Sequence, residues 1–378
     1  MFFSVILIKL SWMNSEDLLY AMALQHIPNL GDTTSKKLIA KLGNAKNVFK
    51  EKRSNLLKIG GVGQVRIQEL NEARHLKAAE EELKFIQANN IRVHYFKDKD
   101  YPEKLKHCLD GPIILFSKGN IDLDKKRIIS VVGTRKISAH GTSFCEELIE
   151  NLAVLDPVII SGFAYGVDIT AQKAAVKNNL QTVGCLAHGL NQIYPKSHKK
   201  YMPEIEKKGG FFTDFWSTDK FDRNNFLKRN RVIAGLSEAT IVIESAEKGG
   251  ALVTADIANS YDREVFAVPG RPTDKYSIGC NNLIKGQKAH VLTSAADLVY
   301  ILNWEINEKQ ESVQKQLFIE LENDEQKIFD FLKSSGKTEL DLLALNCQFP
   351  TFKTASLLLN MELKGAIRPL PGKLFEAI

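Results

Sequence analysis

The middle of the chain alternates short apolar runs with polar, glycine-bearing loops. Three runs rich in β-branched residues, Ile128 to Val132, Val158 to Ile160 and Ala239 to Glu244, are each followed by a loop and then by a stretch with helical periodicity. Continuous apolar runs of this length are typical of strands that are buried on both faces of a parallel sheet. The pattern therefore predicts an α/β domain.

The loop that follows each run has residues suited to anions. The first loop carries Gly133 followed by Arg135 and Lys136, the second runs from Ser161 to Asp168, and the third runs from Ser245 to Gly250. Such loops lie at the carboxyl ends of strands and the amino ends of helices, where unpaired amides favour anions. Together they predict one site for a polyanion. Taken singly, each glycine loop could equally be the tight turn that βαβ packing requires.

A third feature is the predicted helix within Phe221 to Ser237. Helical spacing places Lys228, Arg231 and Gly235 on one face, whereas Leu227, Val232 and Leu236 favour the other, so we expect one basic face and one packed face. From Lys196 to Arg231 there are ten Lys or Arg and five Asp or Glu, a local net charge of +5. Cations interleaved with aromatic residues suit a single nucleic-acid strand. The aromatic residues are Tyr201, Phe211, Phe212, Phe215, Trp216 and Phe226, most of which we expect in the core.

These motifs give the chain a family resemblance. It resembles the DNA-processing protein A family (DprA, also called Smf) over roughly Tyr101 to Leu302. The matching segments are Val132 to Arg135, Ser161 to Ala164, Gly166 to Asp168, Tyr194 with Pro195, Phe226 to Ser237, Gly250 to Ala255, Val265 to Gly270 and Ser277 to Ile284. The chain departs from the family pattern at Tyr165, where arginine is usual, at Gln172, where histidine is often found, and at His198, where asparagine is common.

The resemblance implies an extended Rossmann-type sheet that holds no dinucleotide and instead grips single-stranded DNA in a basic pocket. It also implies a homodimer that hands the strand to RecA recombinase, acting on strands coated with single-strand-binding protein, without a cofactor, metal or catalytic residue. The residues expected to contact DNA are Gly133, Arg135, Lys136, Ser161, Gly162, Phe163, Phe226, Arg229, Asn230, Arg231, Lys248, Gly249 and Gly250. For Arg229 and Arg231 the alternative is a buried structural cation.

The flanking regions read as smaller modules. Two glycine turns, Ile27 to Gly31 and Ile59 to Gly63, each precede a predicted helix, Thr33 to Leu42 and Gln64 to Leu70, and resemble helix-hairpin-helix turns. Near the carboxyl end, three predicted helices and a hairpin turned at Pro371 follow the order of a winged helix. We therefore expect a helical domain at residues 14–76, a Rossmann-type domain at 77–302, a linker at 303–323 and a winged-helix-like domain at 324–378. Translation could begin at Met13, ahead of a helix cap.

Composition narrows the function classes. The net charge of +6 over 378 residues is small, so a basic surface that attracts nucleic acid has to come from a local cluster of Lys and Arg. The five cysteines are scattered without close pairs, which predicts neither a disulfide framework nor a cysteine zinc site and favours the reducing cytoplasm. The apolar stretch Met1 to Leu10 is far shorter than the roughly 20 residues of a membrane span, and we expect no membrane association.

An enzyme is the alternative reading. Nucleotide-processing hydrolases of the lysine-decarboxylase-like Rossmann type also keep a glycine pair near a strand end, but they follow it with a glutamate. Here Gly249 and Gly250 continue into Ala251 to Ala255, which has no glutamate in register. The Walker A, Gly-x-Gly-x-x-Gly, His-Glu-x-x-His and Gly-x-Ser-x-Gly motifs are absent from the sequence. We therefore expect a DNA-binding protein that is not an enzyme.

Overall fold

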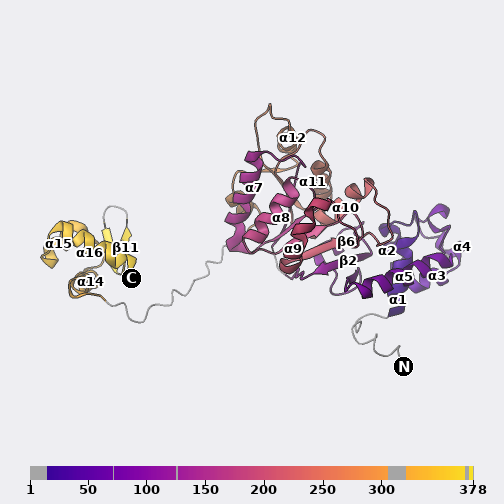
Figure 1. The fold of residues 1–378 in the computed structure, drawn as a ribbon, viewed down its shortest axis with the longest axis horizontal. Coiled ribbons are helices and arrows are strands. Elements are labelled where there is room, and N and C mark those ends of the chain that lie inside the picture. The colour runs from indigo at the N-terminus through magenta and orange to yellow at the C-terminus, as the bar shows by residue number, and fades with distance from the viewer. Residues whose placement is uncertain (1–14, 71, 125–126, 305–320, 371–373, 378) are drawn as a thin grey trace, which may run out of the picture. The chain divides into compact units, whose positions relative to one another are not determined.

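The computed structural model of the protein describes residues 15–70, 72–124, 127–304, 321–370 and 374–377. The chain divides into two compact units, residues 1–304 and residues 305–378 (Figure 1). Most of the predicted linker at 303–323 and the proposed start at Met13 lie outside the described residues. Each unit is therefore described by itself.

The larger unit is built on a sheet of nine strands in the order β1-β2-β6-β5-β4-β3-β7-β8-β9 among the described residues. From β6 to β9 all neighbours are parallel, whereas β2 pairs antiparallel with both β1 and β6. The strands are β1 (Arg92–Tyr95), β2 (Ile114–Gly119), β3 (Ile128–Val132), β4 (Val158–Ser161), β5 (Thr182–Cys185), β6 (Gly210–Thr213), β7 (Ala239–Val242), β8 (Glu264–Ala267) and β9 (His290–Val291). The chain runs from β3 outward to β6 and then returns to place β7 beside β3. This reversal is the switch point at which parallel sheets bind ligands.

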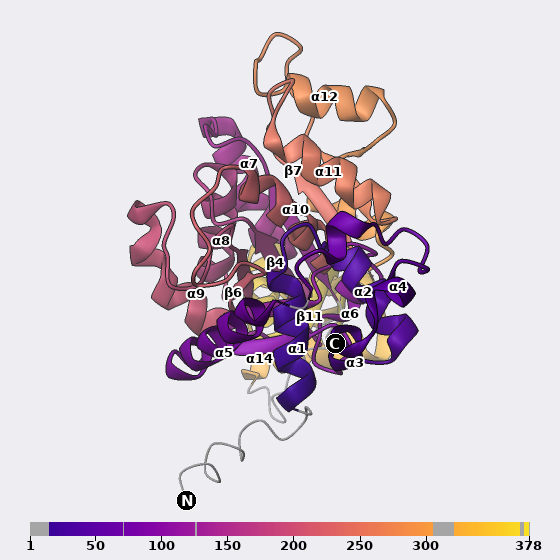
Figure 2. The same ribbon diagram turned by 90° about the vertical axis from the view of Figure 1, so that its right-hand side faces the viewer.

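Both faces of the sheet are covered, which confirms the α/β prediction. Along β3, Ile128 and Val132 pack into one apolar cluster while Ile129 and Val131 pack into another, because successive side chains of a strand point to opposite faces. Residues of α10, α11 and α12 belong to the first cluster, and residues of α7, α8 and α13 belong to the second. Figures 1 and 2 show α7 beside α8 and α10 beside α11. The helices are α7 (Ala139–Leu152), α8 (Val167–Lys177), α9 (Met202–Lys208), α10 (Asn224–Leu236), α11 (Gly250–Ser260), α12 (Ile278–Lys285) and α13 (Ala295–Ile301), with short 3-10 turns η3 (Ala153–Leu155) and η4 (Lys196–Tyr201).

The amino-terminal helices pack against the β1–β2 edge of this sheet, since their apolar cluster includes Ile114, Phe116 and Trp216 (Figures 1 and 2). They are α1 (Ser15–His26), α2 (Asp32–Leu42), α3 (Ala45–Lys50), α4 (Arg53–Leu56), η2 (Gln64–Ile67) and α5 (Ala73–Ala88). The short helix between β1 and β2, α6 (Glu103–Lys106), packs instead against α10. The first glycine turn is followed by a helix as predicted. The second is followed only by the 3-10 turn η2, so the predicted helix to Leu70 is wrong. The expected domain boundary after residue 76 falls inside α5.

The two glycine turns lie side by side. The Nζ of Lys37 on α2 donates to the carbonyl of Gly60 at 2.6 Å, and the Nη1 of Arg66 on η2 donates to Thr34 Oγ1 at 3.0 Å. These contacts join the two turn regions and engage Lys37 and Arg66 within the protein.

The carboxyl-terminal unit has the predicted order of three helices and a hairpin. Its elements are α14 (Asn323–Ser335), β10 (Thr338–Glu339), α15 (Leu340–Cys347), α16 (Thr351–Leu363), β11 (Ile367–Leu370) and β12 (Leu374–Ala377), and its sheet order is β10-β12-β11. Ile328, Leu343 and Met361, one from each helix, are fully buried in its own apolar cluster. This is the winged-helix arrangement.

Two further predictions concern chemistry and location. All five cysteines are free and buried. Within the described ranges, no helix combines the length and the apolar character needed to cross a bilayer.

Candidate nucleic-acid interface

The loop after β3 presents two cations at the switch point. Arg135 and Lys136 are exposed, and neither makes an ion pair with another described residue. Packing requires glycine at position 133, because a Cβ there would lie 2.4 Å from Cγ2 of Val167, the first residue of α8. The glycine lets the start of α8 pack closely on this loop, and the loop carries its two cations outward.

The loop after β4 is an interior scaffold rather than a phosphate clamp. The Ser161 hydroxyl donates to the carbonyl of Val131 at 2.6 Å, and Phe163 is 1% exposed with a φ of 56°. Ser161, Gly162 and Phe163, which were expected to contact DNA, are therefore buried beneath the surface. The exposed residue of this loop is Tyr165, whose hydroxyl lies 3.1 Å from Ser197 Oγ.

In two of the three loops, carboxylates of the chain itself accept backbone amides. Glu244, at the end of β7, accepts from the amide of Ser138 at 2.9 Å and from the Ser138 hydroxyl, and Ser138 caps α7. Asp168, in the first turn of α8, accepts from the amides of Gly162 and Ala164 at 3.1 and 3.3 Å. The expectation that these amides are free for an external anion is therefore wrong, because internal carboxylates complete them. Positive charge for a ligand has to come from side chains.

The third loop leads from β7 into α11. Lys248 and Gly250 are exposed, and a Cβ on Gly250 would meet no atom within 4 Å, so the backbone there faces open space. A Cβ on Gly249 would lie 2.2 Å from Ser245 Oγ, which makes that glycine a packing requirement. Of the three predicted loops, this one leaves its backbone open to a ligand.

Arg229 of α10 is a buried structural cation, which is the alternative reading of its motif. Its Nη1 donates to the carbonyls of Gly162, at 2.7 Å, and Cys185. A Cβ on Gly162 would lie 2.6 Å from both Arg229 Nη2 and Asp168 Oδ2, so glycine makes room for this charged pair. Burial raises the pKa of Asp168, and the charge of Arg229 opposes that shift. The neighbouring Asn230 is also buried, with its Nδ2 3.5 Å from the carbonyl of Gly250.

Arg231 is half-buried and ion-paired, against the expected basic face of this helix. Its Nη2 lies 3.1 Å from Asp32 Oδ2 and pairs with Asp214. Asp32 begins α2, so this bridge fastens the amino-terminal helices to the sheet domain. Helical spacing alone could not reveal these partners, because both come from distant parts of the sequence. Leu227, expected in the packed face, is 50% exposed instead.

Three aromatic side chains gather in the surface beside Arg135. The ring centroid of Tyr194 lies 5.0 Å from that of Phe221 and 5.5 Å from that of Phe226. Tyr194 is 36% and Phe221 47% exposed, and Phe226 is partly exposed. The guanidinium of Arg135 lies 5.1 Å from the Phe226 centroid. We call Tyr194, Phe221 and Phe226 the aromatic cluster.

Tyr194 and Phe221 are absent from the sequence-based site. Tyr194 stands with Pro195 in one of the family-matching segments and Phe221 begins the segment that holds the predicted basic helix, and that setting was the available signal. The expectation that most aromatics are core residues is confirmed by the burial of Phe211, Phe212, Phe215 and Trp216.

Exposed cations surround the aromatic cluster. Besides Arg135 and Lys136, α10 contributes Lys228, and Arg223 immediately precedes that helix. None of the four forms an ion pair with another described residue. Exposed rings next to unpaired cations provide stacking surfaces and phosphate contacts together, which is the combination that single-stranded nucleic acids require.

Comparisons with known proteins agree with this geometry. A family model described as DNA recombination-mediator protein A matches residues 92–303, and a DprA winged-helix model matches residues 315–373. The chain is 36% identical over 202 residues to the DNA processing protein DprA of Streptococcus pneumoniae strain R6, covering 53% of this chain and 71% of that protein. It is 31% identical over 300 residues to protein Smf of Escherichia coli K12, covering 78% and 80%.

Solved structures extend the comparison to the fold. DNA processing protein A from S. pneumoniae matches with a TM-score of 0.63 and 29% identity, covering 75% of this chain and 96% of that one. DNA processing protein A from Helicobacter pylori, whose structure addresses its mode of single-stranded DNA binding, matches with a TM-score of 0.51 and 26% identity, covering 56% and 95%.

Proposed function

The chain belongs to the DNA recombination-mediator protein A family, and on this basis we propose that it binds single-stranded DNA and loads RecA recombinase onto it during natural transformation. The observation that carries the DNA-binding step is the aromatic cluster of Tyr194, Phe221 and Phe226, with the unpaired guanidinium of Arg135 5.1 Å from the Phe226 ring. The related H. pylori protein binds single-stranded DNA, which supports the same ligand here.

In this proposal the residues expected to contact DNA divide into those that touch the strand and those that hold the surface in place. Arg135 and Lys136 pair with phosphates together with Lys248, and the open backbone at Gly250 allows close approach. Phe226 and its aromatic neighbours stack on bases. The buried residues Ser161, Gly162, Phe163, Arg229 and Asn230, together with the half-buried Arg231, hold this surface in place and do not touch the strand themselves.

The arrangement favours a single strand over a duplex for a physical reason. Bases in a duplex are already stacked on each other, so the aromatic cluster has no free base face to contact. An unpaired strand offers both its phosphates and its base faces, and base stacking on aromatic side chains contributes about 1 to 3 kcal/mol per base. A duplex would have to unpair first.

The site also suits binding better than catalysis. The Ser161 hydroxyl is committed to the carbonyl of Val131, and the carboxylates of Asp168 and Glu244 accept internal amides. These are the polar groups that a hydrolase at this switch point would need as nucleophile or base. Their engagement in the scaffold supports a mediator that works without a catalytic residue or cofactor.

Loading a recombinase requires contact with DNA and protein at once. A homodimer would place two copies of this cationic surface on one strand. Two linked sites bind a strand more tightly than either site alone, even when no further contacts form. The strand could then be held while other surfaces remain free for RecA.

The test is fluorescence anisotropy with labelled single-stranded and blunt duplex oligonucleotides across a salt series. We expect at least about tenfold tighter binding to the single strand, the equivalent of one stacked base. Equal affinity for both forms would refute the DNA-binding proposal. Strand exchange with RecA on strands coated by single-strand-binding protein tests the loading step separately, since absent stimulation would remove that step alone.

A further inference from the structure

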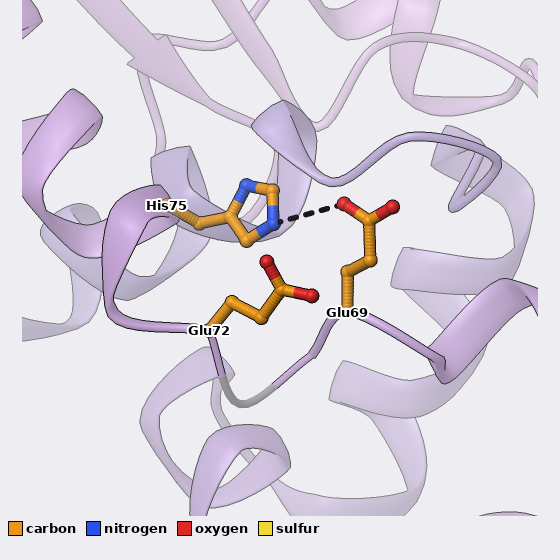
Figure 3. Close-up of side chains that lie close together, drawn as sticks. All are labelled: Glu69, Glu72 and His75. Atoms are coloured by element: carbon orange, nitrogen blue, oxygen red, sulfur yellow. Dashed lines mark ion pairs between the residues drawn. The ribbon is translucent and has the colours of Figure 1, made fainter.

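The segment that enters α5 brings three side chains of metal-ligating types together, away from the proposed DNA-binding loops. Glu69, Glu72 and His75 each place one ligand atom so that all three lie within 4.8 Å of one another. Figure 3 shows the imidazole of His75 and the two carboxylates turned toward a common space. His75 Nε2 lies 3.4 Å from Glu69 Oε2. Two ligands at about 2.1 Å from a shared tetrahedral ion would stand about 3.4 Å apart, so this spacing already suits an ion.

The imidazole of His75 provides the independent observation. His75 is 1% exposed, and its Nε2 makes no well-formed hydrogen bond, although Glu69 Oε2 lies 3.4 Å away. A buried polar atom without a partner is unfavourable, and an ion between Nε2 and the carboxylates would satisfy it. The opposite ring nitrogen is held, because His75 Nδ1 lies 2.9 Å from Nδ1 of His26. When His75 donates in that bond, its Nε2 carries a lone pair that faces the carboxylates, as metal-binding histidines do.

Arg74 is the competing charge at this cluster. Its Nε lies 2.7 Å from Glu72 Oε2, and its Nη2 pairs with Glu69. The Arg74 side chain is 60% exposed, and exposed ion pairs contribute little to stability because solvent screens them. Arg74 can therefore leave the carboxylate oxygens when an ion arrives.

We propose that Glu69, Glu72 and His75 bind a divalent transition-metal ion, with Zn²⁺ as the best match. One imidazole nitrogen and two carboxylate oxygens form a mixed donor set that zinc accepts in tetrahedral sites with three protein ligands. The scattered cysteines pointed away from a zinc site, and no cysteine takes part in this one. The sequence analysis did not single out these three residues, which stand three positions apart at 69, 72 and 75.

The ion would join two parts of the larger unit. His26, at the end of α1, contacts the Trp216 ring with centroids 4.9 Å apart, and Trp216 Nε1 donates to Gln25 Oε1 at 2.9 Å. Trp216 follows β6 of the central sheet. An ion on His75 would therefore fix the His75–His26–Trp216 contact and hold the start of α5 against the sheet domain. Trp216 also makes a spectroscopic reporter of binding.

The experiment uses the full-length protein, stripped with a chelator and titrated with Zn²⁺ by calorimetry and intrinsic fluorescence. We expect one ion per chain, a change in tryptophan emission and a rise in melting temperature with added Zn²⁺. Glu72→Gln should weaken binding at least about tenfold, the smallest loss that is usual even for residues that only support a ligand. Arg74→Ala should tighten binding, because it removes the competitor. A purely structural ion-pair network predicts no zinc effect in either variant.

A matched control and a cobalt spectrum complete the test. Glu264→Gln removes an exposed carboxylate 2.9 Å from His290 Nε2, and it should leave zinc affinity unchanged. Co²⁺ in place of Zn²⁺ should give tetrahedral d–d bands without thiolate charge transfer. The proposal is overturned by a thiolate band, which would place the ion on a cysteine, by zinc affinity that is equal in wild type and Glu72→Gln, or by no stoichiometric binding.

Discussion

Two arginines expected on the same site should behave in opposite ways when each is changed to alanine. Arg135 is exposed and unpaired among the described residues, whereas the Arg231 side chain is 16% exposed and lies between Asp32 and Asp214. Arg135→Ala should therefore weaken DNA binding and leave folding intact. Arg231→Ala should destabilise the fold and leave the salt dependence of binding unchanged.

The size of each effect follows from the environment. Removing one phosphate contact to a single strand should reduce the log-log salt slope by about 0.7, so wild type should lose about 2.6-fold more affinity than Arg135→Ala over a fourfold rise in salt. Breaking a buried charge pair costs about 3 to 5 kcal/mol. Without Arg231, Asp214 is left as an unpaired carboxylate that is only 6% exposed, which is costly. Asp32 is 17% exposed and still accepts a hydrogen bond from the amide of Ile113 at 2.8 Å, so its loss is smaller. We therefore expect a cost at the lower end of this range for Arg231→Ala.

The assays are anisotropy with a labelled oligonucleotide at several salt concentrations and urea unfolding of the same preparations. Arg92→Ala removes one exposed cation from the edge strand β1 and serves as the control, with an unchanged slope expected. An unchanged slope in Arg135→Ala, or a reduced slope without loss of stability in Arg231→Ala, would refute the assignment of these two roles.

The remaining predictions concern the aromatic cluster, acid stability and the carboxyl-terminal unit. Phe221→Ala should weaken binding of a short single strand by about 1 to 3 kcal/mol, measured by anisotropy. Tyr300→Ala, which removes a side chain that is 87% exposed outside the aromatic cluster, is the control and should leave the affinity unchanged. Equal losses in the two variants would contradict base stacking on Phe221. Burial lowers the pKa of His188 below its ordinary 6.5, so the unfolded chain takes up its proton first as pH falls. Stability should therefore decline as pH falls from 6.5 to the folded pKa of His188, by up to about 1.4 kcal/mol per pH unit from this group. Urea unfolding at pH 7 and pH 5 measures that decline, and a smaller decline is expected in His188→Gln. Deleting residues after Glu311 should leave a folded protein that still binds single-stranded DNA, because residues 1–304 form one compact unit; insoluble product on expression would contradict this independence.

Local patterns in the sequence were enough to predict the architecture. Apolar runs such as Ile128 to Val132 could only be strands with both faces covered, and the alternation of their side chains between two apolar clusters bears this out. The three helices and hairpin after Asn323 were predicted for the same reason, since periodicity and turn residues act within a few positions of one another. The predicted helix after Gly63 shortened to a 3-10 turn, where local signals were weak.

The site depended on contacts that no local pattern contains. Arg229 and Arg231 differ little from Lys228 in sequence, yet Arg229 is buried and Arg231 half-buried, because Asp168, Asp32 and Asp214 from other elements lie beside them.

The same holds for the surface groups. Tyr194 and Phe221 lie 27 positions apart and meet as one exposed cluster, and Glu244 closes a helix terminus more than 100 positions before it. The sequence by itself therefore determined which elements form and how they are ordered, because secondary structure follows from near neighbours. Only the tertiary structure decided which charges are neutralised internally and which remain for a ligand, because a charge is paired or free according to what the fold brings beside it.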